Sequence, residues 1–355
     1  MSVYIAMICM CILFVIIFQR MARNGRMTYI LSQKASLITC VLLLATVQGF
    51  RAYSVGTDTK SYVEMFLYPD KYGHEIGFKL LCDAIRWISD SPSMFLFTCA
   101  LIINGGVAIA CYKMSEIPCL SMLLWVFLYY YFASFNAIRQ YLAIALLLNG
   151  YCYARSKKWL KYLFCLIMAV SFHQSAIIGI VFALIPIIDN GKRAHALVVT
   201  AIILMTSCIP ILWESIESFV IRYFPKYGTY FAQQADYVTS GGGIRQSIIN
   251  VAICASFLFL VDNRSESRCK YDAILLLSVL LSFLQMWILM FDRFLWYFEV
   301  FSIMAIPEVA KQSNSKIDSQ SKMVYLVFVV LAACLFMLYY LYSGAHRVTP
   351  YSWAY

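Results

Sequence analysis

Charged residues are scarce in this 355-residue chain, at 13% of the sequence, whereas hydrophobic residues make up 62%. A soluble domain is about a quarter charged and about half apolar, so this composition excludes a chain folded around one core in water. The apolar residues recur in runs along the whole length, which indicates many membrane spans and no attached globular domain. The sequence predicts one polytopic, all-α integral membrane domain over residues 1–355, with the lipid bilayer as a partner.

Several familiar signatures are also missing. The 13 cysteines form no C-x-x-C pair and no Cys/His metal spacing, so neither a disulfide framework nor a metal site is expected, and no cofactor is indicated. The segment 1–18 lacks the basic start and the small-residue cleavage site of a cleavable signal peptide. The net charge of +10 does not indicate nucleic acid, because no basic stripe with interleaved aromatics lies outside the apolar runs. Lys and Arg of short loops are instead typical of the cytoplasmic side of a membrane protein.

Eleven apolar windows predict the membrane segments. They are 2–18, 35–50, 93–112, 117–134, 137–153, 160–188, 195–213, 245–261, 271–291, 294–310 and 323–342. The window 160–188 would be about 44 Å long as one helix, against a hydrocarbon core of about 30 Å, and His173 interrupts it. As one span it would divide the 28 basic residues 14 inside and 14 outside; as a hairpin turning at His173 it divides them 17 and 11. The hairpin therefore fits the positive-inside rule better.

The hairpin gives about twelve membrane segments, with both termini outside and two long external loops, about 51–92 and 214–244. Within the first loop, Ile76 to Ser89 places Phe78, Leu81, Ile85 and Ile88 on one face, as an interfacial helix would.

Polar side chains from five places meet at the external mouth of this topology. They are Arg51; Asp58; Asn136, Arg139 and Gln140; His173 and Gln174; and Asp292 with Arg293. Ionisable groups at a membrane face usually line a water-filled cavity or meet a partner. Each also has a structural reading: the arginines can snorkel to the interface, His173 can pack between helices, Asp58 can shape a turn, and Asp292 with Arg293 can anchor a turn.

The functional reading rests on arginine chemistry. A guanidinium is always charged and grips phosphate oxygens in pairs, so arginines in one external cavity suit a lipid-linked pyrophosphate and the charge that develops as it leaves. A histidine or aspartate beside them can take the proton of an attacking hydroxyl. No D-x-D motif occurs in the external loops, so arginines rather than a divalent metal would hold the phosphates.

A family resemblance lies in the first half of the chain, over roughly residues 40–190. It is carried by Arg51, Gly56-Thr57-Asp58, Tyr62, Phe66 and Glu75-x-Gly77-Phe78, then by Arg139-Gln140 with Leu142-Ala143, and by Phe172-His173 with Ser175-Ala176. These short, ordered motifs resemble the EpsG-like branch of the Wzy polysaccharide polymerases. The resemblance implies a GT-C-like polytopic bundle and an inverting, metal-independent glycosyltransferase. Its donor and acceptor would be undecaprenyl-pyrophosphate-linked glycans on the periplasmic side of the bacterial inner membrane.

The predicted site follows from the motifs and the topology together. The predicted pyrophosphate-binding residues are Arg51, Arg139 and Arg293, and the predicted catalytic residues are His173 and Asp58. Gln140, Glu75, Arg222 and Arg245 are supporting candidates. A chain-length regulator is a further candidate partner of an O-antigen or capsule polymerase.

Two other classes stay open. A flippase for lipid-linked oligosaccharides also needs arginines, but it should carry charge through the middle of the membrane. An O-antigen ligase shares the chemistry of the polymerase. A membrane acyltransferase is disfavoured, because its expected histidine motif is not evident.

Overall fold

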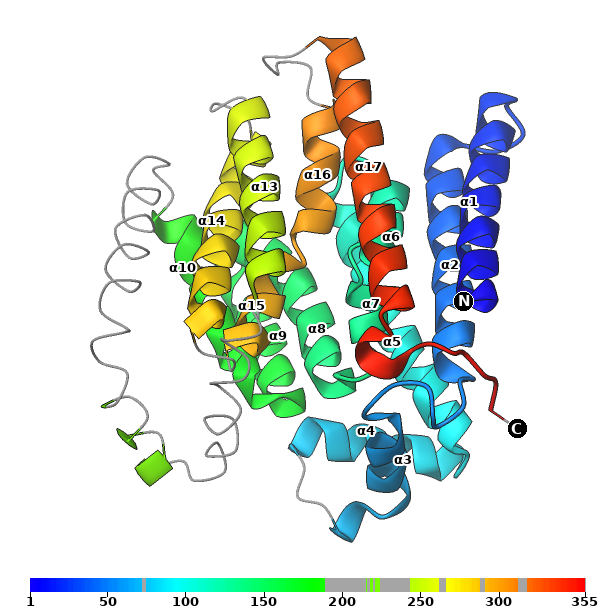
Figure 1. Ribbon diagram of the computed structural model, residues 1–355, viewed down its shortest axis with the longest axis vertical. Coiled ribbons are helices and arrows are strands. Elements are labelled where there is room, and N and C mark those ends of the chain that lie inside the picture. Colours follow the sequence, from blue (N-terminus) through cyan, green and yellow to red (C-terminus); the bar gives the residue numbers. More distant parts are fainter. Residues whose placement is uncertain are drawn as a thin grey trace. The chain divides into compact units, whose positions relative to one another are not determined.

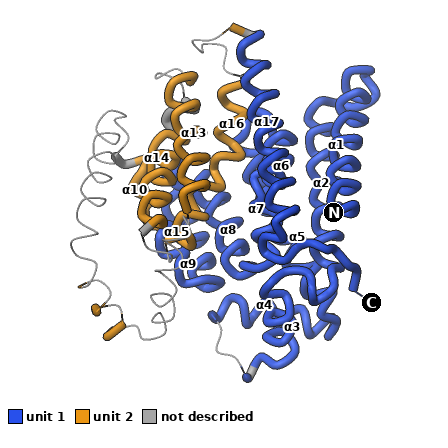
Figure 2. The backbone as a smooth tube through the Cα atoms, viewed as in Figure 1, with its two compact units in different colours: residues 1–179, 319–355 blue, residues 180–318 orange. Residues whose placement is uncertain are grey.

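The structure, a computed structural model, describes residues 1–71, 75–188, 215, 218–219, 221–223, 243–261, 266–287, 291–311 and 318–354. These residues are helical almost throughout, and no strand occurs among them, which confirms the all-α prediction. The chain divides into two compact units (Figure 2). The first unit comprises Met1–Gly179 and Ser319–Tyr355, and the second unit comprises Ile180–Asp318.

Four helices of the first unit are long and apolar enough to cross a membrane. They are α1 (Ser2–Arg23), α2 (Tyr29–Gly49), α5 (Pro92–Met114) and α17 (Ser319–Tyr342). A helix of this length spans more than about 30 Å, which matches the hydrocarbon core of a bilayer. Shorter apolar helices accompany them. The chain is therefore a multi-pass membrane protein, and the count of about twelve membrane segments stays a prediction.

Local sequence sets where several of these helices begin and end. The Thr28 hydroxyl accepts a hydrogen bond from the Leu31 amide (3.2 Å) and caps α2, and a proline begins both α5 and α6 (Pro118–Phe127). Tyr129 adopts a left-handed conformation (φ 72°) and separates α6 from α7 (Tyr130–Ala133). The window 117–134, predicted as one span, is therefore divided by this residue into two short helices, and its crossing of the membrane stays a prediction.

Most helices of the first unit pack against helices that are close to them in the chain. In the order α1, α2, α5, α8 (Ile138–Arg155) and α9 (Trp159–Phe172), each helix packs on the next, and α17 packs on α6 (Figure 1). A buried polar network crosses this bundle: Gln48 donates to Ser134 (2.8 Å), Asn104 donates to Gln48 (2.8 Å), and Trp125 donates to Asn104 (3.0 Å). Because each of these groups has a partner, the network fixes how α2, α5 and α6 meet.

The chain turns at His173. This residue ends α9 with an extended backbone (φ −155°, ψ 122°), and the 3₁₀ helix η2 (Gln174–Gly179) follows. The Tyr162 hydroxyl donates to the carbonyl of Gly179, so η2 folds back along α9. A single helix would separate residues 162 and 179 by about 25 Å, which excludes this contact. The predicted turn at His173 is confirmed.

The first predicted loop is itself helical. It contains α3 (Thr59–Leu67), η1 (Pro69–Lys71) and α4 (Ile76–Ile88). On the face predicted for α4, Phe78 and Ile85 are buried against the protein and Leu81 is partly buried. Ile88, the last residue of the helix, is 76% exposed. Contact of this face with a membrane interface stays a prediction.

The second unit contains five described helices. They are α10 (Ile180–Ile188), α13 (Ile244–Leu260), α14 (Glu266–Trp287), α15 (Phe291–Glu299) and α16 (Ser302–Lys311). α13 packs on α14 and α16, and α14 packs on α15. The predicted window 294–310 is thus divided between two helices. The predicted span 195–213, and most of the predicted loop 214–244, lie outside the described residues.

Candidate functional site

Arg51, just beyond α2, is fully buried and organises the loop that follows. Its Nε donates to the Val55 carbonyl (3.3 Å) and the Thr59 hydroxyl (3.1 Å), Nη1 donates to the Gln48 carbonyl, and Nη2 donates to the Phe135 carbonyl (3.1 Å). Burial lowers the pKa of Arg51 to about 10, so the guanidinium remains charged at neutral pH. Its use as a pyrophosphate ligand stays a prediction; the geometry gives it a role in holding the loop.

Gly56 is required by its conformation and by its surroundings. Its φ of +98° lies in the left-handed region, and a Cβ atom would lie 2.6 Å from Thr59 Oγ1 and 2.7 Å from Asn136 Oδ1. The amide of Gly56 donates to the Arg347 carbonyl (2.8 Å), and the amide of Thr57 donates to the His346 carbonyl (3.2 Å). The Gly-Thr part of the sequence motif therefore shapes the loop and donates backbone hydrogen bonds to residues 346–347.

These contacts bring in a segment that the sequence reasoning missed, residues 343–354, which follows α17. Its other anchors include the hydrogen bonds from Ala52 N to Ser352 O (2.8 Å), from Ala354 N to Phe50 O (2.8 Å) and from Tyr4 Oη to Val348 O (2.7 Å). Hydrogen bonds therefore join the 343–354 segment both to the start of α1 and to the first loop. The one signal in the sequence was the pair His346-Arg347, shortly after the last apolar window.

The backbone of this segment is strained beside the loop. His346 (φ 58°) and Arg347 (φ 51°) are both left-handed, which costs about 1–2 kcal/mol for each non-glycine residue. Such strain clusters at functional sites and persists where surrounding contacts enforce it. Burial lowers the pKa of His346, and the carboxylate of Asp58 acts in the opposite direction. The side chains of Arg347 and Asp58 are exposed, so both remain accessible to a ligand.

Asn136 joins the loop and the 343–354 segment to the start of α8. Its Oδ1 accepts from the amide of Asp58 (3.3 Å), and its Nδ2 donates to the His346 carbonyl (2.9 Å). Asp58 precedes α3, and its side chain makes no capping hydrogen bond. The predicted candidates Asp58 and Arg139 are therefore held around one asparagine, three residues before Arg139.

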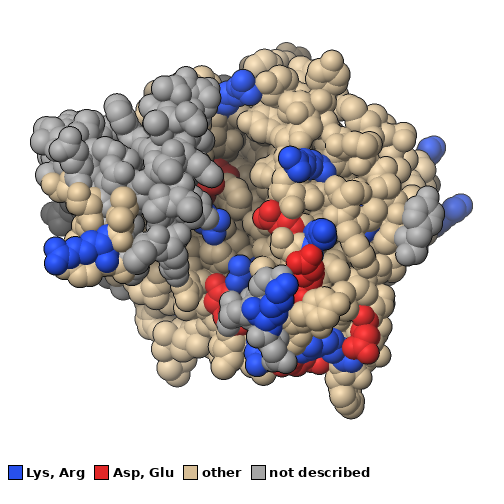
Figure 3. Space-filling view, turned by 60° about the horizontal axis from the view of Figure 1, so that its bottom comes forward, with Lys and Arg blue, Asp and Glu red and all other residues tan. Residues whose placement is uncertain are grey.

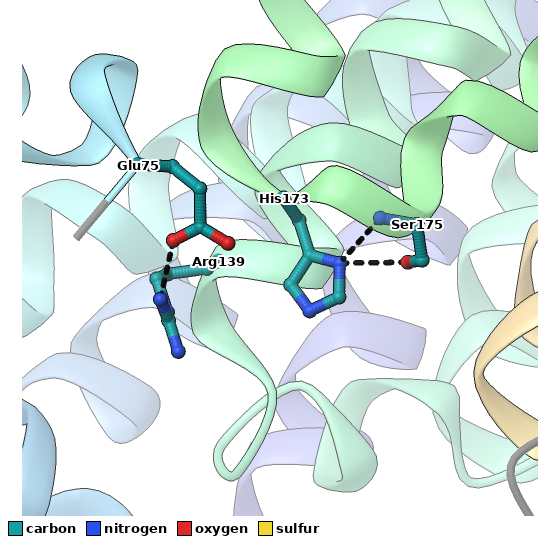
Figure 4. Close-up of polar contacts among 4 residues, drawn as sticks. All are labelled: Glu75, Arg139, His173 and Ser175. Carbon is teal, nitrogen blue, oxygen red and sulfur yellow. Dashed lines mark hydrogen bonds and ion pairs between the residues drawn. The ribbon is translucent and has the colours of Figure 1, made fainter. Parts of the chain in front are cut away.

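Arg139 lies in the first turn of α8 and forms a salt bridge with Glu75 (Figure 4). It also lies over the ring of Phe78, 5.8 Å from its centroid. Burial raises the pKa of Tyr62, and the charge of Arg139 acts in the opposite direction. The side chains of Arg139 and Glu75 are only 23% and 17% exposed. The Nε of Arg139 is buried and has no hydrogen-bond partner among the described residues.

His173 completes this cluster. Its Nδ1 lies 2.6 Å from the Ser175 hydroxyl and accepts from the Ser175 amide (3.3 Å) (Figure 4). Because an amide N–H can only donate, Nδ1 is the acceptor and the neutral ring carries its proton on Nε2. His173 is near Glu75 because Gly77 lets α4 approach α9: a Cβ at Gly77 would meet the Ser171 hydroxyl and lie 2.9 Å from the Ser171 carbonyl carbon. This close approach explains the Glu-x-Gly motif.

The remaining predicted residues lie apart from this cluster or outside the first unit. Gln140 is buried in α8. Arg222, Arg245 and Arg293 are exposed and belong to the second unit, so their proximity to Arg139 stays a prediction. In that unit the buried Glu299 accepts from Gln246 (2.7 Å) and Asn250 (3.4 Å), as a packed carboxylate would.

The end of the first unit that carries the cluster is rich in charge. Figure 3, which brings this end forward, shows basic and acidic side chains side by side over the region of α3 and α4. The charged residues of these helices and their connections include Lys60, Glu64, Lys71, Glu75, Lys79, Asp83 and Arg86. The surface is thus of mixed sign, with Arg139 recessed within it.

Comparison with known proteins places the chain in context. The EpsG family model matches residues 34–353, which covers α2 through the 343–354 segment. No curated protein and no solved structure matches the chain.

Proposed function

Because the chain belongs to the EpsG family of polysaccharide polymerase-type membrane proteins, we propose that it joins undecaprenyl-pyrophosphate-linked repeat units into O-antigen or capsule. The growing glycan on its lipid pyrophosphate is the donor, and a hydroxyl of a second lipid-linked unit is the acceptor. The transfer takes place at the periplasmic face of the bacterial inner membrane and is inverting and metal-independent.

The observation that carries this proposal is the unpartnered donor of Arg139. A buried N–H with no acceptor costs about 1–3 kcal/mol, so such groups in native proteins usually have a ligand or water as partner. Glu75 holds one end of the guanidinium and leaves the Nε edge for another acceptor. A pyrophosphate oxygen is a suitable acceptor, because charge-assisted bonds to phosphate are about twice as strong as neutral ones. Arg347, exposed on the 343–354 segment, is the second phosphate-binding candidate in the first unit.

The transfer needs a base for the acceptor hydroxyl. The hydroxyl oxygen attacks the anomeric carbon of the donor, the bond from that carbon to the pyrophosphate breaks, and the hydroxyl proton passes to the base. We assign the base to Asp58, whose carboxylate is exposed and makes no capping hydrogen bond. The Asp58 amide donates to Asn136, three residues before Arg139, so the start of α8 holds both the proposed base and the proposed phosphate ligand.

His173 is assigned to orientation. The contacts of Nδ1 with Ser175 hold the ring in place, and we assign it to position the sugar or phosphate group of the substrate. Arg51 supports the site by holding the loop that carries Asp58. Arg293 remains a proposed pyrophosphate-binding residue, and Gln140, Arg222 and Arg245 remain supporting candidates.

The decisive experiment follows the product in a host that ligates its glycan to lipid A core. Deleting the gene, or replacing Arg139 by alanine, should leave single repeat units on the core and no ladder on a lipopolysaccharide gel, because flipping and ligation continue. Bare core would instead indicate a flippase or a ligase. An unchanged ladder would remove the protein from the pathway.

A further inference from the structure

The first unit carries an apolar groove between α2 and α5, and none of its lining residues belongs to the cluster around Arg139. It is lined by Lys34, Leu37, Ile38, Val41, Leu42, Leu101, Gly105, Ala108, Ile109 and Tyr112, with a volume of about 360 Å³. Both helices are long enough to cross a membrane, and the groove is open at its surface, where Ile109 is 51% exposed. Every lining residue except the terminal Lys34 and Tyr112 is aliphatic or glycine.

Gly105 faces the open part of the groove. A Cβ atom at this position would meet nothing within 4 Å, so a larger side chain there would extend into the groove. The neighbouring Gly106 is different: its Cβ would lie 2.8 Å from the Cβ of Ala145, so that glycine serves helix packing. The two adjacent glycines of α5 therefore face different surroundings: Gly105 faces the groove and Gly106 packs against α8.

One end of the groove is cationic. The exposed Lys34 places its Nζ over the ring of Tyr112, 5.8 Å from the centroid, and no acidic residue lines the groove. The connection from α1 to α2 adds Arg23 and Arg26 at the same end of the helices. A lysine at the end of an apolar groove between spans attracts an anionic headgroup, as basic pockets on the cytoplasmic side of membrane proteins do.

The length of the groove selects its occupant. From Leu101 to Tyr112 it follows α5 for about 16 Å, which is half of a hydrocarbon core of about 30 Å. An acyl chain of one leaflet fits this length, whereas a second transmembrane helix would extend across both leaflets. We propose that the groove binds one anionic phospholipid of the leaflet next to the α1–α2 connection. Its acyl chain lies along Gly105 and its phosphate lies on Lys34.

The headgroup contact determines which lipid is preferred, and the groove shape determines whether a lipid is retained. Lipid tails are as apolar as the groove, so burial of the chain gives little preference for one lipid over another. The preference comes from Lys34, and one lysine near anionic lipid is worth about fivefold in binding. Filling the groove should instead remove the bound lipid whatever its headgroup.

Native mass spectrometry of the full chain in detergent tests this with equal amounts of phosphatidylglycerol and phosphatidylcholine. The unmodified protein should retain one lipid and favour phosphatidylglycerol about fivefold. Lys34→Gln should retain a lipid without that preference, and Gly105→Leu should retain no lipid. Ala332→Leu, which also introduces a leucine at an exposed position of α17, should behave as the unmodified protein.

A photoreactive residue at Ile109 gives a second measurement that needs no filled groove. It should crosslink to the retained lipid, whereas the same residue at Ile102, which is exposed on α5 outside the groove, should not. Lipid retention unchanged by Gly105→Leu would overturn the proposal. So would a crosslink from Ile109 to a second copy of the chain, which would make the groove a protein interface.

Discussion

Replacing Arg139 by lysine tests whether the site needs only the positive charge of Arg139 or also its several N–H donors. Lysine keeps the positive charge and can follow Glu75, but its single ammonium cannot occupy the positions of both Nη1 and Nε. If the Nε edge binds the leaving pyrophosphate, the variant loses one charge-assisted hydrogen bond, worth about 1.5–3 kcal/mol. At about 1.4 kcal/mol per factor of ten, polymerisation should slow by about 10- to 100-fold. Arg139→Ala should lose more, because it also leaves the half-buried Glu75 without its partner.

The assay is the initial rate of polymer formation by the purified protein from a lipid-linked repeat unit. Arg86→Lys is the matched control, because Arg86 forms a salt bridge with Asp83 on the same end of the molecule, and an exposed pair contributes about 0–1 kcal/mol. If Arg139→Lys polymerises as fast as the Arg86→Lys control, the second hydrogen-bond donor of Arg139 is not needed for the reaction. Arg139 would then only balance the charge of Glu75 or extend to the membrane interface.

Two further predictions concern packing and sidedness. Gly77→Ala should destabilise the protein by about 1–3 kcal/mol and slow polymerisation, because the new methyl group meets Ser171. The destabilisation should appear as a lower thermal midpoint in detergent, whereas Gly105→Ala, which faces open space, should change neither property. Equal midpoints for the two variants would contradict the close approach of α4 and α9. A cysteine at Lys60 should react with an impermeant thiol reagent in intact spheroplasts and one at Lys158 should not, because the basic loop after α8 is predicted to be cytoplasmic; labelling at Lys158 without lysis would reverse the topology.

Hydropathy predicted much of the fold because the bilayer imposes a length on each span. The windows that became α1, α2, α5, α8, α13, α14 and α17 were found in this way. The turn at His173 was predicted from the excess length of its window. The breaks at Tyr129 and at residues 300–301 were missed, because a left-handed residue or a short interruption changes the average hydropathy of a window very little.

The candidate site was predicted less completely, for a different physical reason. Arg139 and Asp58 were predicted as polar residues at the external mouth, and Glu75 was predicted from the family motif. The structure pairs Arg139 with Glu75 and joins Asp58 to Asn136. The burial of Arg51 could not be read from its own segment, because it depends on carbonyls of Val55 and Phe135 that only the folded chain brings together. The 343–354 segment was missed because backbone hydrogen bonds between distant segments leave no periodicity in the sequence.

The attachment of the 343–354 segment also has a consequence for biosynthesis. The Tyr351 hydroxyl donates to the Val47 carbonyl (2.9 Å) across 304 residues of chain. At about 5–20 residues per second, the ribosome takes roughly 15–60 s to deliver the partners of the first loop after that loop has been made. Throughout that interval the amides of Gly56 and Thr57 lack their acceptors. A chain that stops before residue 343 would insert α1 to α17 and still never form the strained turn beside Asp58, so translation itself decides when this end of the molecule becomes ordered.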